Sequence, residues 1–95
     1  MRFTWDVAKN NFNVRRRGLA FKDAARIFEG QTVEREDNRY DYGEVRMYAI
    51  GLLNGVETTV IYTERGNDER HIISAWQSSP QERRTFWQEI EGQAN

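Results

Sequence analysis

The spacing of apolar residues predicts one short strand followed by two helices in the first third of the chain. Phe3 and Trp5 alternate with polar neighbours, which is typical of a strand. Asp6 is a good N-cap, so the first helix is expected to begin there and to end near residue 17, before Gly18. A second helix is expected over residues 21–29. The residues expected on the buried sides of these helices are Val7, Ala8, Phe12 and Val14 in the first, and Ala24, Ala25, Ile27 and Phe28 in the second.

From residue 31 onward the pattern changes to one that favours strands and turns. Asn54-Gly55 is a strong hairpin signal, and Ser79-Pro80-Gln81-Glu82 is a capping box that opens a last helix, expected to end near residue 91. The strands between these signals are expected at residues 32–36, 45–53, 56–63 and 71–76. The sequence therefore predicts an α+β domain over residues 1–95, with a short N-terminal strand, two helices, a four-stranded antiparallel meander and a C-terminal helix.

Composition excludes several classes of protein and of site. The 95 residues include no Cys and one His, so a disulfide framework, a thiolate nucleophile and a metal cage of His and Cys are all excluded. Aromatic residues make up 13% of the chain, which argues against disorder. No apolar run approaches the roughly 18 residues of a membrane span, and the N-terminal residues lack the apolar core of a signal peptide. We therefore expect a cytoplasmic protein without a membrane partner.

Charge is segregated along the chain, although the net charge is only -1. Residues 1–26 carry seven basic and two acidic side chains, a net of +5, whereas residues 27–45 carry two basic and six acidic ones, a net of -4. Of the 14 cations, 12 are Arg and 2 are Lys. Arginine suits bidentate contacts with phosphate, although GC-rich coding produces the same bias. The first segment is thus the part expected to attract anions.

Short motifs spread over residues 3–86 resemble a known family in their order and spacing. The motifs are Phe3-x-Trp5-Asp6-x-x-Lys9-x-x-x-Asn13, Gly18-x-x-Phe21-x-x-Ala24-x-x-x-Phe28, Tyr42-Gly43-Glu44-x-Arg46 with Gly51, Tyr62-Thr63-x-Arg65, Ile72-Ile73-Ser74-Ala75, and Glu82-Arg83 with Phe86. Together they resemble the BrnT toxins of bacterial type II toxin–antitoxin systems. The resemblance implies a RelE-like fold, metal-independent and cofactor-free cleavage of RNA, and growth arrest. It also implies neutralisation by a BrnA-like ribbon-helix-helix antitoxin, with operator DNA bound only through the toxin–antitoxin complex.

Three positions differ in chemical type from that family pattern. Arg17 stands where the family usually has His, and on the last strand His71 and Trp76 stand where it usually has Arg. Two functions therefore stay open: an endoribonuclease toxin, or a catalytically weakened module of the same fold that binds antitoxin or RNA without cleavage. A structural subunit that dimerises through an exposed strand edge is a third alternative.

His71 is the candidate proton carrier for RNA cleavage. Cleavage without a metal needs a base for the 2′-hydroxyl, an acid for the leaving oxygen, and cations around the phosphate. His71 is the one side chain whose ordinary pKa lies near neutrality. The alternative is a strand histidine bonded to a neighbour, and simple alternation would place it on the same face as Ile73 and Ala75, partly buried.

The other catalytic candidates are cations and one carboxylate. Lys9, Arg46 and Arg65 match the family spacing and could stabilise the phosphate, although each could equally be a solvated or paired surface charge. Glu44 lies two residues before Arg46 on the same expected strand face, so it could act as a base, orient Arg46, or form an ordinary surface ion pair.

RNA-binding candidates lie at the end of the first helix and the end of the last strand. Arg15, Arg16 and Arg17 could bind phosphates, although cations at a helix C-terminus also interact favourably with the helix dipole. Trp76 could stack on a base or pack in the core. A metal site of oxygen ligands is conceivable, but a solvated edge is favoured, so no metal is predicted; the acidic residues concerned are Glu34, Glu36, Asp37 and Asp41.

Overall fold

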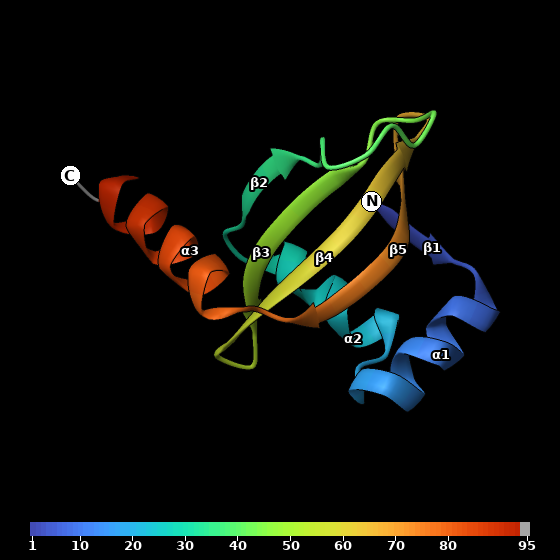
Figure 1. The fold of residues 1–95 in the computed structure, drawn as a ribbon, viewed down its shortest axis with the longest axis horizontal. Coiled ribbons are helices and arrows are strands. Elements are labelled where there is room, and N and C mark those ends of the chain that lie inside the picture. Colours follow the sequence, from blue (N-terminus) through green and yellow to red (C-terminus); the bar gives the residue numbers. More distant parts are fainter. Residues whose placement is uncertain (94–95) are drawn as a thin grey trace.

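Residues 1–93 are described by the computed structural model, in which a twisted sheet carries helices on both of its faces (Figure 1). The elements in chain order are β1 (Arg2–Trp5), α1 (Val7–Arg17), α2 (Phe21–Ala24), the 3-10 helix η1 (Ala25–Glu29), β2 (Val33–Glu36), β3 (Met47–Leu53), β4 (Val56–Arg65), β5 (Glu69–Gln77) and α3 (Pro80–Gln93). The α+β class is confirmed, and the order of helices and strands agrees with the apolar pattern.

The sheet differs from the predicted meander in one respect. Its described strands run in the order β1-β5-β4-β3-β2, and β1 pairs with β5 in parallel while the other pairs are antiparallel. The sheet is therefore five-stranded and mixed, and the prediction of a four-stranded antiparallel sheet with a separate first strand is wrong. The apolar pattern of β1 identifies a strand, but it carries no information about the strand beside it.

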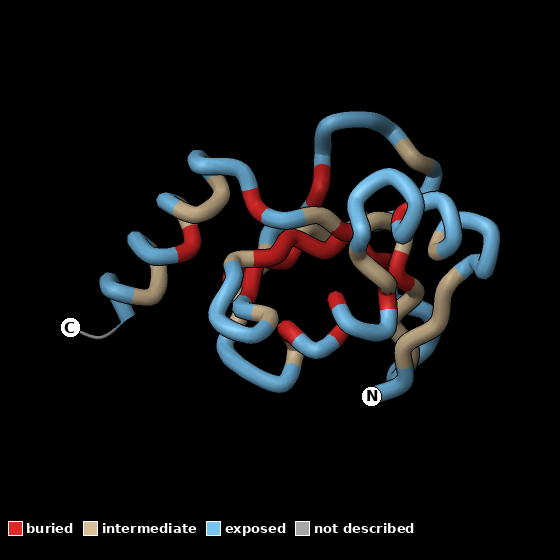
Figure 2. The backbone as a smooth tube through the Cα atoms, turned by 90° about the horizontal axis from the view of Figure 1, so that it is seen from below, coloured by how far each residue is buried: buried red, intermediate tan, exposed pale blue. Residues whose placement is uncertain are grey.

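The main core lies between the sheet and the layer formed by α2 and η1. Phe21 and Ile27 from these helices pack against Val60, Tyr62 and Ile72 of the central strands. Phe3 and Trp5 of β1 pack against the same cluster, so Thr4 between them points to the opposite face of the sheet. Buried residues are concentrated in the strands and in these short helices, as Figure 2 shows.

The first helix packs through polar side chains, contrary to the predicted apolar stripe. Val7 and Phe12 are 68% and 54% exposed, whereas Asn13 is 4% exposed. The amide nitrogen of Asn13 donates to the Leu19 carbonyl, and the Asn10 side chain accepts from the backbone N–H of Phe21, both at 2.8 Å. The turn between α1 and α2 has backbone groups that need partners, and these asparagines supply them.

The second predicted helix is shorter and tighter than expected. Its first turn is α-helical, but residues 25–29 form a 3-10 helix, which lets Ile27 approach the sheet. Gly51 of β3 leaves the space for this approach, because an added Cβ would stand 2.9 Å from the Ile27 Cβ.

α3 covers part of the opposite face of the sheet. Phe86 forms a small buried cluster with Val33 of β2 and Ile50 of β3. Ile50 points away from its neighbour Ala49, which lies in the main core, so α3 and the α2–η1 layer lie on opposite faces. The rest of the sheet face on which α3 packs is not covered by a helix (Figure 1).

A β-bulge in β5 changes which side chains reach this second face. Ile61 pairs with Ser74 but the next residue, Tyr62, pairs with Ile72, so Ile73 is an extra residue in β5. Both Ile72 and Ala75 therefore point into the main core. The prediction that His71 shares a face with Ala75 is wrong for this reason.

Replacing Gly51 by Ala should destabilise the protein by about 1–3 kcal/mol, the usual cost of overpacking. The added methyl group would press on the Ile27 side chain and backbone, which belong to the core. Urea unfolding at pH 7 measures the change, with Gly92→Ala in α3 as the control because its Cβ meets nothing within 4 Å. Equal stability of the two variants would contradict this account of the η1–β3 contact.

Candidate functional site

A cleft of about 600 Å³ opens on the face of the sheet that α3 leaves uncovered. Its floor comes from the central strands and its walls come from the end of α1 and from the loop of residues 37–46. The lining residues are Arg17, Asp37, Arg39, Tyr42, Arg46, Ile61, Ile73, Ser74 and Trp76. Three guanidinium groups against one carboxylate make this lining suitable for an anion.

Arg17 is held firmly at one side of the cleft. Its guanidinium donates to the Asn13 side chain at 3.1 Å, to Ser74 Oγ at 3.0 Å and to the Ala75 carbonyl at 3.3 Å. β1 pairs only with residues 69–72 of β5, so this part of the β5 edge is left to Arg17. The same guanidinium lies 5.3 Å from the centre of the Trp76 ring. Arg17 therefore joins α1 to the sheet as well as lining the cleft.

Arg39 and Arg46 form the other side. Asp37 is buried and binds Arg39 through both carboxylate oxygens, at 2.9 and 3.0 Å, and the Arg39 bonds hold the pKa of Asp37 below its ordinary value. Arg46 lies 4.0 Å above the ring of Tyr42 and contacts Glu44 at 3.4 Å. The Tyr42 hydroxyl donates to Asp37 at 3.2 Å, which links the two arginines through one loop.

Glu82 holds the indole ring of Trp76 in place. Its indole N–H donates to Glu82 Oε1 at 3.0 Å. The same carboxylate accepts from the Tyr48 hydroxyl at 2.5 Å and from the backbone N–H of Ser79 at 2.8 Å. Burial opposes ionisation of Glu82, but these hydrogen bonds outweigh it and lower the pKa. The α3 N-terminus therefore sets the position of the indole ring.

His71 lies on the same face, nearer the start of β5. Its Nδ1 is 2.8 Å from Thr4 Oγ1, and it is flanked in the sheet by Thr4 of β1 and Thr63 of β4. Burial is the main reason that its pKa is lowered from the ordinary value of 6.5, and the nearby charges of Arg65 and Lys9 act in the same direction. The lowered pKa favours the neutral imidazole, which is the form able to accept a proton.

The structure divides the predicted site residues into three sets. Arg17, Arg46 and Trp76 line the cleft, with Glu44 paired to Arg46 beside it. Lys9 and Arg65 are close enough to His71 to influence its pKa. Thr63, which lies beside His71 in the sheet, donates its hydroxyl to the carbonyl of Val45, the residue before Arg46. Arg15 and Arg16 are exposed and are not among the cleft residues.

Several residues of this face escape sequence reasoning. From the sequence, Asp37 is only a conceivable metal ligand and Tyr42 only part of a family motif, and nothing there indicates the contacts that join Asp37 to Arg39 and Tyr42 within one loop. The Ser79–Glu82 capping box predicts that Glu82 bonds to Ser79, but it gives no sign of the bond to Trp76. Thr4 carries no sequence signal beyond its place in a strand.

Two of the acidic residues of the β2 region bond to side chains of other residues. Glu34 accepts from the Tyr62 hydroxyl, and Asp37 binds Arg39. Across residues 1–93, no group of three or more acidic or His side chains is arranged to hold a metal ion. None of the helices in that range combines the length and apolar character needed to cross a bilayer.

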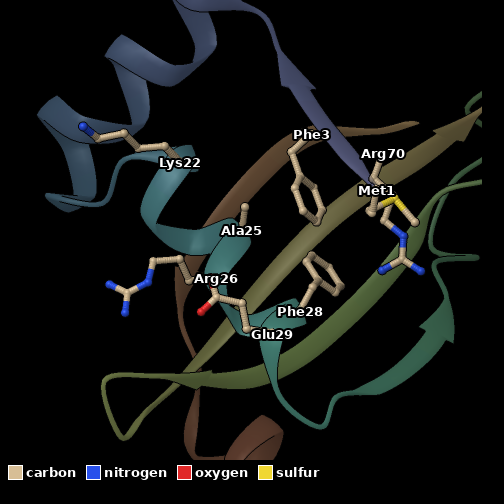
Figure 3. Close-up of a pocket in the computed structure, with 8 residues that line it drawn as sticks. All are labelled: Met1, Phe3, Lys22, Ala25, Arg26, Phe28, Glu29 and Arg70. Atoms are coloured by element: carbon tan, nitrogen blue, oxygen red, sulfur yellow. The ribbon is translucent and has the colours of Figure 1, made fainter. Parts of the chain in front are cut away.

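A second cavity of about 510 Å³ lies on the other side of the molecule, between β1 and the α2–η1 layer (Figure 3). Phe3 and Phe28 stack in it with ring centres 5.4 Å apart, and the Arg70 guanidinium lies 4.8 Å from the Phe28 ring. This cavity contains none of the predicted site residues.

Comparisons with known proteins agree on one family. The sequence model described as "Ribonuclease toxin, BrnT, of type II toxin-antitoxin system" matches residues 5–82. Among solved structures, the chain is similar to the ribonuclease toxin BrnT of Brucella abortus, with a TM-score of 0.64 and 27% sequence identity. The match covers 83% of this chain and 97% of that one. A search of curated proteins gave no match.

Proposed function

Because the chain belongs to the BrnT family of ribonuclease toxins of type II toxin–antitoxin systems, we propose that it cleaves RNA internally, without a metal ion, on the open face of its sheet. Residues 1–95 act as one RelE-like toxin domain in the cytoplasm, and cleavage arrests growth. The observation that carries this proposal is an arginine-lined cleft on the same sheet face as a histidine whose pKa lies below its ordinary value.

In the proposed reaction the 2′-hydroxyl of the RNA attacks the adjacent phosphorus. The neutral His71 accepts the hydroxyl proton as the new O–P bond forms. Arg46 and Arg65 stabilise the charge that gathers on the phosphate oxygens. The bond from phosphorus to the 5′-oxygen then breaks, and Lys9 gives the proton that this oxygen needs. The products are a 2′,3′-cyclic phosphate and a free 5′-hydroxyl.

The cleft supplies binding rather than proton transfer. Arg39 and Arg46 contact backbone phosphates of single-stranded RNA, and the rings of Tyr42 and Trp76 offer surfaces for bases. Arg17 adds positive charge at the far side, although one of its guanidinium nitrogens, Nη1, already bonds within the protein. Arg15 and Arg16 lie outside the cleft and steer RNA toward it by charge alone.

One observation favours the alternative of a module that binds without cleaving. Two of the three positions that depart from the family pattern, Arg17 and Trp76, are built into the scaffold by hydrogen bonds and by the contact between them. If the family's reaction depends on the residue types usual at these positions, this chain would keep the fold and lose the chemistry.

The partner is an antitoxin, as membership of a type II system implies. We propose that it is a BrnA-like protein with a ribbon-helix-helix domain, and that operator DNA is bound only through the complex. An antitoxin that covers the arginine-lined cleft would block RNA without touching His71.

Binding of a single-stranded RNA oligonucleotide should weaken as salt rises, because each phosphate contact releases counterions. Arg46→Ala should reduce the slope of log affinity against log salt by about 0.7, the value for one phosphate on a single strand. The exposed Arg84 of α3 provides the control, since Arg84→Ala removes the same charge away from the cleft. Equal slopes for the two variants would mean that Arg46 does not contact the backbone.

Single-turnover cleavage in EDTA should rise with pH through the pKa of His71, with the midpoint of the rise below pH 6.5. The sign follows from the base role: protonation inactivates the base, and a lowered pKa moves that loss to a pH below 6.5. His71→Gln should cost about 100–10,000-fold and abolish this pH step. Arg46→Ala and Arg65→Ala should each cost about 100–1,000-fold and keep it.

Two results of that assay would overturn parts of the proposal. A His71→Gln protein with the activity and pH profile of the wild type would remove His71 from the reaction. A wild-type protein that binds antitoxin tightly but cleaves no RNA would replace the enzyme by the binding module.

A further inference from the structure

A chain of hydrogen bonds runs from Glu69 to His71 across the β1–β5 pair. Thr4 Oγ1 lies 2.8 Å from Glu69 Oε2 and 2.8 Å from His71 Nδ1. Arg2 donates to the other carboxylate oxygen, Glu69 Oε1, at 2.6 Å. The hydroxyl of Thr4 therefore stands between a carboxylate and an imidazole nitrogen.

The number of protons available for these hydrogen bonds determines the tautomer of His71. An ionised carboxylate can only accept, so the single hydroxyl proton of Thr4 points to Glu69. The Thr4 oxygen then has only lone pairs to offer His71, and Nδ1 must carry the proton that bonds to it. In a neutral imidazole the other nitrogen, Nε2, is left with the free lone pair.

Glu69 is ionised in this setting. The Thr4 hydroxyl and the Arg2 guanidinium both bond to its carboxylate, and these bonds lower its pKa. The other charged groups that influence His71 are Arg65 from β4, and Asp6 and Lys9 from the start of α1. Arg65 and Lys9 oppose protonation of the imidazole, whereas Asp6 and Glu69 favour it.

The sheet register places these groups together. In the parallel pair, Arg2 lies opposite Glu69 and Thr4 lies opposite His71. Phe3 packs against the core on the other face of the sheet. A shift of β1 by one residue would bury Thr4 and expose Phe3, so this packing fixes the register.

We propose that Thr4 and Glu69 are positioning residues that hold His71 as the Nδ1–H tautomer and so leave Nε2 as the proton acceptor. The catalytic use of that nitrogen rests on the function proposed above, but the tautomer itself does not. An isolated neutral imidazole favours the opposite tautomer, with the proton on Nε2, so the assignment has a definite spectroscopic consequence.

Nitrogen-15 NMR of the imidazole tests the proposal directly, because the protein has one histidine and only its two ring nitrogens have to be distinguished. Above the pKa of His71, the wild-type protein should show a protonated Nδ1 and an unprotonated Nε2. Thr4→Val removes the acceptor and should move the proton to Nε2, whereas Thr4→Ser keeps the hydroxyl and should restore the wild-type pattern. Glu69→Gln should also move it, because an amide can donate to Thr4 and turn the hydroxyl proton toward Nδ1.

Glu64→Gln is the matched control, since Glu64 is an exposed carboxylate of the neighbouring strand β4 and does not contact Thr4 or His71. It should leave the tautomer unchanged. A wild-type spectrum with the proton on Nε2, or one that Thr4→Val and Glu69→Gln do not change, would overturn the proposal whatever the activity.

Cleavage by the same variants separates this inference from the proposed function. With His71 as the base, Thr4→Val should lower the single-turnover rate by about 10–100-fold, part of the factor that a general base supplies, and Thr4→Ser should recover it. If Thr4→Val moves the proton to Nε2 and cleavage is unchanged, the positioning of the tautomer stands and the base role of His71 falls.

Discussion

The site depends on one extra residue in β5. Without the bulge at Ile73, simple alternation would point His71 and Trp76 to opposite faces of the sheet. With it, Arg70, Ile72 and Ala75 face the α2–η1 layer, while His71 and Trp76 share the open face. The bond from Arg17 to Ser74, which follows the bulge, uses this arrangement. A single irregularity thus brings the proposed proton acceptor and an aromatic ring to the same surface.

The arginines of this surface are oriented by the side chains that they contact. The chain is close to neutral, yet Arg39 is oriented by the buried Asp37 and Arg46 by the ring of Tyr42. Contacts of this kind would reduce the reorganisation needed to bind a phosphate, because the guanidinium planes already have fixed directions. His71 differs in that burial lowers its pKa, which favours the neutral imidazole that the proposed base role requires.

Much of the fold could be predicted from sequence, and the failures have physical reasons. The Asp6 cap, the Asn54-Gly55 turn and the Ser79–Glu82 box are local signals, and the elements they delimit are present. The partner of β1, the bulge at Ile73 and the polar inner side of α1 depend on long-range packing, which leaves no local pattern. The sequence likewise identifies His71, Arg46 and Trp76 as candidates, but it gives no sign of the bonds that Thr4 and Glu82 make across the sheet or of those that Asp37 makes within its loop.

The central claim is that RNA binds on the open face of the sheet between Arg46, Trp76 and His71. NMR titration with a 2′-O-methyl RNA oligonucleotide, which lacks the attacking hydroxyl, tests it most directly. The Trp76 indole and the His71 imidazole should shift together, while the indole of Trp87 in α3, which bonds to Glu57, should stay unchanged. Binding that shifts Trp87 and leaves both Trp76 and His71 unchanged would contradict it.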